Sequence, residues 1–268
     1  MATDATITPA PSRPRKVFYP DGDGKPMAET PDHMRAMIEL IQGIGDLLAP
    51  DPRVFVGGNL FVYYVEGQPG RVFSPDVMVA RGVDPARSRR VYKTWENDEI
   101  GPELVVEVSS RGTRQEDLRR KFLLYRDVLK VREYFVFDPL GEYLRPRLQG
   151  FRLDGDDYYP VAPVAGRLPS AVLGVHLVAD GTLVRLFDPD AGRIIPTRAE
   201  ALAAARRAGR HQARTIRAQA AALAENERII AEGERAIRER DEALERAEAE
   251  RAALLAEIAR LRGGERGG

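Results

Sequence analysis

The chain has 268 residues, of which 43% are hydrophobic, and this is enough for one domain with a sizeable core and an accessory segment. Its 41 basic and 41 acidic residues balance, so any surface that binds phosphate must be local. The absence of cysteine excludes a disulfide framework, thiol catalysis and Cys-ligated zinc. No apolar run approaches the ~20 residues of a membrane span, and the N-terminus lacks a signal pattern. We therefore expect a cytoplasmic protein without membrane contact.

The composition divides the chain into three parts. Residues 1–16 are rich in Pro, Thr, Ala and Ser without periodicity, which predicts a disordered lead-in. Residues 17–190 alternate short apolar runs with turn residues and helical patterns, as expected for an α/β domain. Residues 191–268 form a separate extension, because from Arg198 onward Ala, Glu and Arg dominate.

A first helix is predicted over residues 31–48, where apolar residues recur at helical spacing and Thr30 can cap the start. His33 and Glu39 lie on this helix and are candidate accessory residues of a site. For His33 the alternative is a partly solvated side chain without a role. Two short apolar segments follow, joined at Gly57 and Gly58, and they suggest a hairpin.

Two acidic residues are set into apolar strands. Asp76 starts the strand of SPDVMVA, and Glu107 lies in PELVVEVSS, where Leu104, Val106 and Val108 alternate with it. A buried, unpaired carboxylate costs several kcal/mol, so Glu107 must meet a cation, a metal or a hydrogen-bond donor. Two carboxylates on adjacent strands repel each other, and a hard divalent cation would relieve that repulsion.

The segment between these strands, residues 81–103, is polar and mixes basic residues with Tyr92 and Trp95. Such a mixture can bind a phosphate backbone and stack on bases, whereas the alternative is a solvated loop that happens to be basic. The candidate nucleic-acid contacts are Arg87, Arg89, Arg90, Lys93 and, further along the chain, Arg114.

A second helix is predicted after the Glu107 strand. Thr113 and Glu116 have capping-box spacing, and an apolar stripe follows at helical intervals. Asp117 and Lys121 lie one turn apart on a neighbouring face of this helix. The strand of REYFVFDP then closes the core.

These motifs, in this order, resemble the Uma-two family of restriction endonuclease-like proteins, a branch of the PD-(D/E)XK nuclease superfamily. The similarity includes PDVMVA, the Val-rich strand with Glu107 and the run TRQEDLRRKFLLY, and it spans roughly residues 17–190. The resemblance implies a restriction endonuclease-like core, with a mixed central sheet flanked by helices. It also implies that Asp76 and Glu107 bind Mg²⁺ (or Mn²⁺) and that a nearby lysine supports the attacking water.

The chain departs from the superfamily pattern at one position. The superfamily lysine would stand two residues after the glutamate, and here Ser109 occupies that place. We expect Lys121 to substitute for it from the helix, with Ser109 and Asp117 as candidate accessory residues. The alternative for Asp76, Glu107 and Lys121 is a buried ion-pair network without activity.

The C-terminal extension is predicted to be a long helix that forms a coiled coil. One heptad column is apolar, interrupted only by Gly209 and Arg251, while the column three residues on is apolar mainly toward the C-terminus. We expect homo-oligomerisation through this helix, and DNA contact by its Arg-rich first part is the alternative. The apolar column consists of Leu202, Ile216, Leu223, Ile230, Ile237, Leu244 and Ile258.

Two functions follow from the sequence. The first is a metal-dependent endonuclease that hydrolyses phosphodiester bonds in DNA, with Asp76, Glu107 and Lys121 as catalytic residues. The second is a catalytically silent nuclease-fold module that binds nucleic acid or a protein partner through its helical tail. The retained acidic residues and Lys121 favour the enzyme, whereas Ser109 in place of lysine favours the silent module.

Overall fold

The strand that carries Glu107 lies inside the main sheet. In the computed structural model, which describes residues 17–22, 30–110 and 112–264, β6 pairs antiparallel with β4 on one side and parallel with β7 on the other. The predicted disordered lead-in, residues 1–16, lies outside the described residues. The six strands, in spatial order, are β1 (Val54–Gly57), β4 (Val77–Arg81), β6 (Leu104–Val108), β7 (Glu133–Phe137), β8 (Leu148–Asp154) and β9 (Asp157–Pro160).

The alternation predicted for β6 separates the two faces of this sheet. Leu104, Val106 and Val108 join a core cluster with the first helix, whereas Val105 lies in a second cluster on the opposite face. Glu107 shares that second face, because side chains two residues apart in a strand point the same way. The carboxylate therefore points into a buried layer.

Helix α1 (Pro31–Leu48) covers the first face and has the predicted boundaries. The Thr30 hydroxyl accepts a hydrogen bond from the His33 amide at 3.2 Å, which confirms the predicted cap. Its residues Ala36, Leu40 and Ile44 are buried against the sheet. An antiparallel four-stranded sheet adds to the same core: β10 (Leu168–Ser170), β11 (Val175–Asp180), β12 (Leu183–Asp188) and β13 (Arg193–Ile194).

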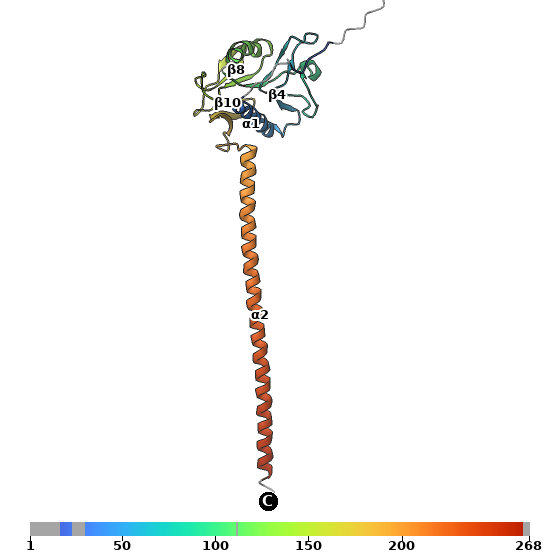
Figure 1. Ribbon diagram of the computed structural model, residues 1–268, viewed down its shortest axis with the longest axis vertical. Helices are drawn as coiled ribbons and strands as arrows, with labels where there is room; N and C mark the ends of the chain where they lie inside the picture. The colour runs from blue at the N-terminus through green and yellow to red at the C-terminus, as the bar shows by residue number, and fades with distance from the viewer. Residues whose placement is uncertain (1–16, 23–29, 111, 265–268) are drawn as a thin grey trace, which may run out of the picture. The chain divides into compact units, whose positions relative to one another are not determined.

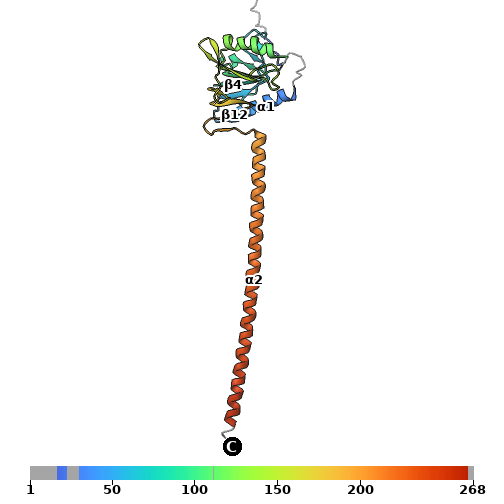
Figure 2. The ribbon, with the colours of Figure 1, turned by 90° about the vertical axis from the view of Figure 1, so that its left-hand side faces the viewer.

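The helix predicted after β6 covers the second face, so that the sheet lies between this helix and α1 (Figures 1 and 2). It begins near the predicted place, but most of it consists of two π-helical segments, Glu116–Lys121 and Leu124–Val128. The Thr113 hydroxyl accepts from the Ser110 amide at 3.0 Å, outside the helix, instead of forming the predicted capping box. Together these layers form the predicted restriction endonuclease-like core, a mixed sheet flanked by helices.

The predicted hairpin at Gly57 and Gly58 is wrong. β1 pairs with β4 in the main sheet, whereas the next strand belongs to a separate three-stranded sheet. The chain crosses between the sheets at Gly58, and the Asn59 amide then donates to the Pro75 carbonyl at 2.8 Å. The small sheet consists, in spatial order, of β3 (Val72–Phe73), β2 (Val62–Tyr63) and β5 (Tyr92–Lys93), and a short 3₁₀ turn, Thr94–Asn97, follows β5.

The C-terminal extension is a single helix, α2 (Arg198–Gly264), as the sequence predicts. The described chain divides into two units between Glu200 and Ala201. The start of α2 belongs to the first unit, where Thr197 and Glu200 exchange backbone-to-side-chain hydrogen bonds as a capping box. No helix among residues 17–22, 30–110 and 112–264 is long and apolar enough to cross a membrane.

We predict that Gly58→Ala destabilises the domain by about 3 kcal/mol or more. A Cβ atom at Gly58 would lie 1.8 Å from the Asp76 carbonyl oxygen and 3.1 Å from the Val77 Cα atom, and neither backbone atom can move without shifting β4. The free energy of unfolding in urea measures the effect. Gly45→Ala in α1 is the control, because a Cβ atom there meets nothing within 4 Å and should add about 1 kcal/mol of helix stability. Equal stability of the Gly58 variant and the wild type would contradict the close crossing.

Candidate active site

Asp76 and Glu107 meet at the edge of the buried layer between the sheet and the π-helical segments. In the antiparallel β4–β6 pair, Val77 lies opposite Val106. The preceding residue of the first strand, Asp76, therefore lies beside the following residue of the second, Glu107. The Asp76 amide nitrogen is 3.4 Å from the Glu107 Oε2 atom. The Val108 amide donates to the Asp76 Oδ2 atom at 2.7 Å. The two predicted carboxylates are therefore neighbours.

Lys121 reaches the same place from the helix. Its Nζ atom lies 2.8 Å from the Glu107 Oε2 atom and 3.2 Å from the Asp117 Oδ1 atom. Asp117 and Lys121 are four residues apart, which brings both side chains to one face of the helix. The structure thus brings together Asp76, Glu107 and Lys121, the three residues predicted from the sequence to be catalytic.

Ser109, at the position where the resemblance places a lysine, belongs to the same network. Its hydroxyl is buried and donates to the Asp117 Oδ2 atom at 2.6 Å. His33, from the first turn of α1, lies with its Nε2 atom 3.6 Å from the Asp76 Oδ1 atom. Three of the four candidate accessory residues therefore lie in the cluster.

Tyr125 is a site residue that the sequence reasoning missed. Its spacing predicts only a member of the apolar stripe that follows Thr113, yet its hydroxyl donates to the Glu107 Oε1 atom at 2.5 Å and the side chain is fully buried. The available signal was its spacing, since Tyr125 follows Lys121 by four residues and a buried tyrosine hydroxyl usually finds a partner. Glu107 is thereby held through both of its oxygen atoms.

The π-helical geometry accompanies this arrangement. The Leu129 amide donates to the Leu124 carbonyl, five residues back, at 3.0 Å. Such wide turns are frequently found at functional sites. Here the wide turns include Asp117, Lys121 and Tyr125, all of which contact the Glu107 network.

The charges in the cluster do not balance without a further cation or proton. The carboxyl groups of Asp76, Glu107 and Asp117 share the single ammonium of Lys121 and lie next to one imidazole. Burial raises the pKa of Glu107 to about 8, and the carboxylates of Asp76 and Asp117 add to that increase against the opposing effect of Lys121. One carboxyl group in this set therefore holds a proton near neutral pH.

Asp76 and Lys121 remain charged. Burial acts to raise the pKa of Asp76, but the neighbouring His33 and Lys121 and the Val108 amide outweigh it and hold that pKa below its usual value. Burial also acts to lower the pKa of Lys121, yet the three carboxyl groups around it hold the pKa above its ordinary value. The cluster therefore combines a fixed ammonium, a fixed carboxylate and a carboxyl group that exchanges a proton.

The atoms that could hold a metal ion are the carboxylate oxygens of Asp76 and Glu107. No group of three or more His, Cys, Asp or Glu side chains is arranged to hold a metal within the described part of the chain. An all-protein metal cage therefore does not fit these residues. Two carboxylates, completed by water and substrate phosphate, suit Mg²⁺, which keeps several of its waters and rarely occupies a closed cage.

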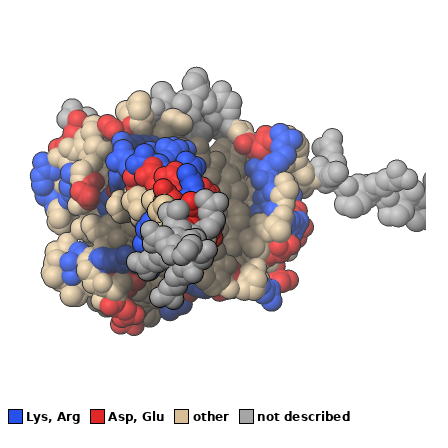
Figure 3. Space-filling view, turned by 90° about the horizontal axis from the view of Figure 1, so that it is seen from below, with Lys and Arg blue, Asp and Glu red and all other residues tan. Residues whose placement is uncertain are grey.

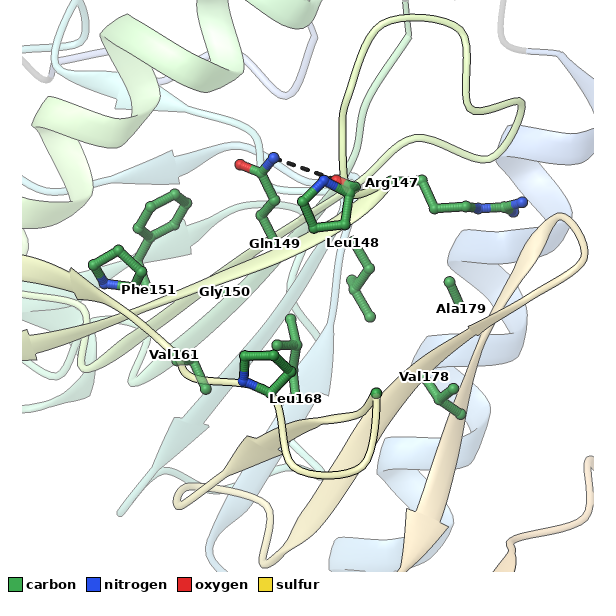
Figure 4. Close-up of a pocket in the computed structure, with 13 residues that line it drawn as sticks. Arg147, Leu148, Gln149, Gly150, Phe151, Val161, Leu168, Val178 and Ala179 are labelled. Atoms are coloured by element: carbon green, nitrogen blue, oxygen red, sulfur yellow. Dashed lines mark hydrogen bonds between the residues drawn. The ribbon is translucent and has the colours of Figure 1, made fainter.

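Glu39 does not join the cluster. It lies on α1 beside a different hollow, lined by Leu186 and Ile195 among others. A larger, apolar hollow of about 470 Å³ also lies away from the cluster, among β8, β10 and β11 (Figure 4). Its wall includes Leu148, Val161 and Val178, and it contains no member of the carboxylate network.

The basic residues of the 81–103 segment are largely paired within the chain. Arg87 forms an ion pair with Glu96 at 2.8 Å, and Arg89 donates to the Asp84 carbonyl and lies 5.0 Å above the Phe55 ring. Through these contacts Arg87 and Arg89 stabilise the conformation of the segment.

Of the remaining candidate contacts, Arg90 and Arg114 are exposed, whereas Lys93 is only 21% exposed. Arg90 forms an ion pair with Asp21 but is 86% exposed. Lys93 pairs with Glu96 and lies 4.8 Å above the Tyr19 ring. Arg114 lines a polar hollow of about 410 Å³. On the face shown in Figure 3, basic and acidic residues are interspersed, in keeping with the zero net charge.

The layered α/β fold and the carboxylate–lysine cluster where β4 begins and β6 ends are those of a restriction endonuclease-like protein. The chain belongs to the Uma2 family, described as "Putative restriction endonuclease", whose family model matches residues 8–179. The resemblance found in the sequence is thereby confirmed. Membership of this family supports the class of nuclease for this protein.

The chain is similar to a solved structure from Anabaena variabilis ATCC 29413, described as a "putative nuclease belonging to DUF820", with 15% identity and a TM-score of 0.41. The similarity covers 59% of this chain and 83% of that one. No curated protein matches the chain.

We predict that Glu107→Gln removes a pH dependence of stability between about pH 4.5 and 8. The folded-state pKa of Glu107 is raised to about 8 from 4.5, so in this window the folded chain keeps a proton that the unfolded chain has lost. The wild type should therefore lose up to about 1.4 kcal/mol of stability per pH unit as the pH rises through the window. Above about pH 8 the contribution of Glu107 to the free energy of unfolding no longer changes with pH.

Urea unfolding in EDTA at half-unit intervals from pH 5 to 8 measures both slopes. Glu99→Gln, which changes an exposed glutamate in a surface turn, is the control for the loss of one carboxylate. Parallel curves for the wild type and Glu107→Gln would contradict the raised pKa.

Proposed function

We propose that this protein is a metal-dependent endonuclease that hydrolyses phosphodiester bonds in DNA. The observation that carries the proposal is the contact of the Lys121 ammonium with Glu107, beside Asp76, at a distance of 2.8 Å. Two carboxylates and one ammonium in a single buried site suit the hydrolysis of a phosphodiester. Membership of a family described as restriction endonucleases supports the same class of reaction.

Asp76 and Glu107 would hold Mg²⁺ or Mn²⁺. When bound, the cation would polarise the phosphate and lower the pKa of a coordinated water. Tyr125 and the Val108 amide orient the two carboxylates by hydrogen bonds at 2.5 and 2.7 Å. Lys121 places a positive charge where negative charge develops on the phosphate oxygens, and this stabilises the transition state.

The exposed basic residues provide contacts for the DNA backbone. Arg90 and Arg114 retain access to a phosphate, whereas Arg87, Arg89 and Lys93 are held by contacts within their own segment. Phosphate contacts of this kind position a duplex without reading its sequence. Arg90 and Arg114 are therefore the better candidates for DNA contact.

We also propose that the protein self-associates through α2. The seven apolar residues of its heptad column, from Leu202 to Ile258, are each between 46% and 64% exposed in the single chain. An apolar stripe that recurs every seven residues is buried when a second helix packs along it. The early Arg-rich part of the helix remains available to DNA under the alternative hypothesis.

We predict that the purified protein nicks or linearises supercoiled plasmid DNA in Mg²⁺ or Mn²⁺ and not in EDTA. Asp76→Ala should abolish both cleavage and Mn²⁺ binding, measured by calorimetric titration. Lys121→Ala should reduce cleavage by about a hundredfold with Mn²⁺ affinity nearly unchanged, because the ammonium acts on the transition state and does not hold the cation.

Lys130→Ala is the matched lysine control, since Lys130 follows the same helix and pairs with the exposed Asp156, away from the cluster. Unchanged Mn²⁺ affinity in Asp76→Ala would refute the metal site. If the wild type binds Mn²⁺ and DNA but cleaves no plasmid, the catalytically silent module replaces the enzyme.

For self-association, we predict that the full chain sediments as an oligomer of its 29.8 kDa protomer. The combined changes Leu223→Glu, Ile230→Glu and Ile237→Glu should yield a monomer, because each places a charge in the apolar column. The control is Ala221→Glu with Ala249→Glu, which adds charge on the opposite side of the helix. A monomeric wild type, or identical sedimentation of both variants, would refute self-association through this column.

A further inference from the structure

Ser109, Asp117 and Lys121 form a continuous chain of contacts that ends on Glu107. The buried Ser109 hydroxyl donates to one oxygen of Asp117 at 2.6 Å, and the other oxygen lies 3.2 Å from the Lys121 ammonium. The ammonium in turn lies 2.8 Å from Glu107. Since Ser109 directly follows the strand that carries Glu107, the contacts leave this end of β6, pass through the helix and return to β6.

We propose that Ser109 and Asp117 are positioning residues that hold the Lys121 ammonium against Glu107. This inference rests on the proposed nuclease function, because it assigns the way in which the candidate catalytic lysine is kept in place. Neither residue needs to touch the substrate. Their role is to act through Lys121.

Lys121 needs positioning residues because a lysine side chain is flexible. It has four rotatable bonds and loses up to about 2 kcal/mol of conformational entropy when it is fixed. Its ammonium is a point charge without the planar geometry that would set its direction. Two carboxylates on different elements restrict it far more than Glu107 alone. Asp117 can serve only while its own orientation is set, and the Ser109 hydrogen bond sets it.

This arrangement gives a physical reason for serine at position 109. When the ammonium arrives from the helix, the strand position two residues after Glu107 is directly adjacent to Asp117. A small hydroxyl there satisfies the Oδ2 atom of a buried carboxylate, and leaving that oxygen without a donor would cost about 1–3 kcal/mol. The departure from the superfamily pattern is thus coupled to the new location of the lysine.

Asp117 is anchored twice, and the two anchors provide a matched pair of variants. Ser109 holds its side chain, while the buried Tyr134 hydroxyl donates to its backbone carbonyl at 3.0 Å. Ser109→Ala and Tyr134→Phe each remove one buried hydrogen bond to the same residue. Only the first removes the bond that orients the carboxylate.

The first test uses the metal-free protein and needs no activity. The ¹H–¹⁵N signal of the Lys121 ammonium, assigned by its loss in Lys121→Ala, should be visible in the wild type because two carboxylates protect it from exchange. It should disappear in Ser109→Ala and Asp117→Asn and persist in Tyr134→Phe and Ser109→Thr. Asp117→Asn keeps the size of the side chain. If Ser109→Ala does not fold, the ammonium signal in Asp117→Asn alone tests whether the Asp117 carboxylate holds Lys121. Persistence of the signal in both Ser109→Ala and Asp117→Asn would overturn the proposal.

The second test is plasmid cleavage. Ser109→Ala and Asp117→Asn should lower kcat by tenfold or more with KM and Mn²⁺ affinity near wild-type values, whereas Tyr134→Phe stays within about twofold and Ser109→Thr recovers most of the loss. Equal effects of Ser109→Ala and Tyr134→Phe would reduce both residues to a structural role. If the wild type cleaves nothing, the proposed function fails, and the ammonium signal still decides whether Ser109 and Asp117 hold Lys121.

Discussion

The burial of the Glu107 carboxyl group is the constraint on which the site depends. The side chain is fully buried in a layer of Val, Tyr and Phe residues, where an unpaired charge would be very unfavourable. Lys121, Tyr125 and the Asp76 amide all approach its two oxygen atoms. Three separate segments of the chain must therefore fold correctly before this one residue is satisfied, which links formation of the site to formation of the core.

The fold meets that constraint by bringing together elements that are distant in the sequence. The antiparallel β4–β6 pair sets Asp76 beside Glu107, and the helix that follows β6 returns over the same face with Lys121 and Tyr125. The close crossing at Gly58 fixes the backbone where Asp76 begins. Because these contacts are already present without a ligand, the charged groups are arranged before any ligand arrives, a condition that favours electrostatic catalysis.

The sequence reasoning succeeded where a pattern is local and failed where partners are distant. Helix α1 and its Thr30 cap follow from apolar spacing and capping chemistry within a few residues. The hairpin predicted at Gly57 and Gly58 was wrong, since paired glycines also permit a close crossing between two sheets. Glu39 was selected for its place on α1, but its position on that helix turns it toward another hollow.

The sequence by itself determined the fold class, the long C-terminal helix and the identity of Asp76, Glu107 and Lys121 as a candidate set. Periodicity and the resemblance to a nuclease family depend only on the order of residues. Only the tertiary structure decided that Lys121 reaches Glu107, that Tyr125 clamps the same carboxyl group, and that Ser109 contacts Asp117. These contacts depend on how a π-helical segment lies over a strand, and a distance between two packed elements is set by all the side chains between them.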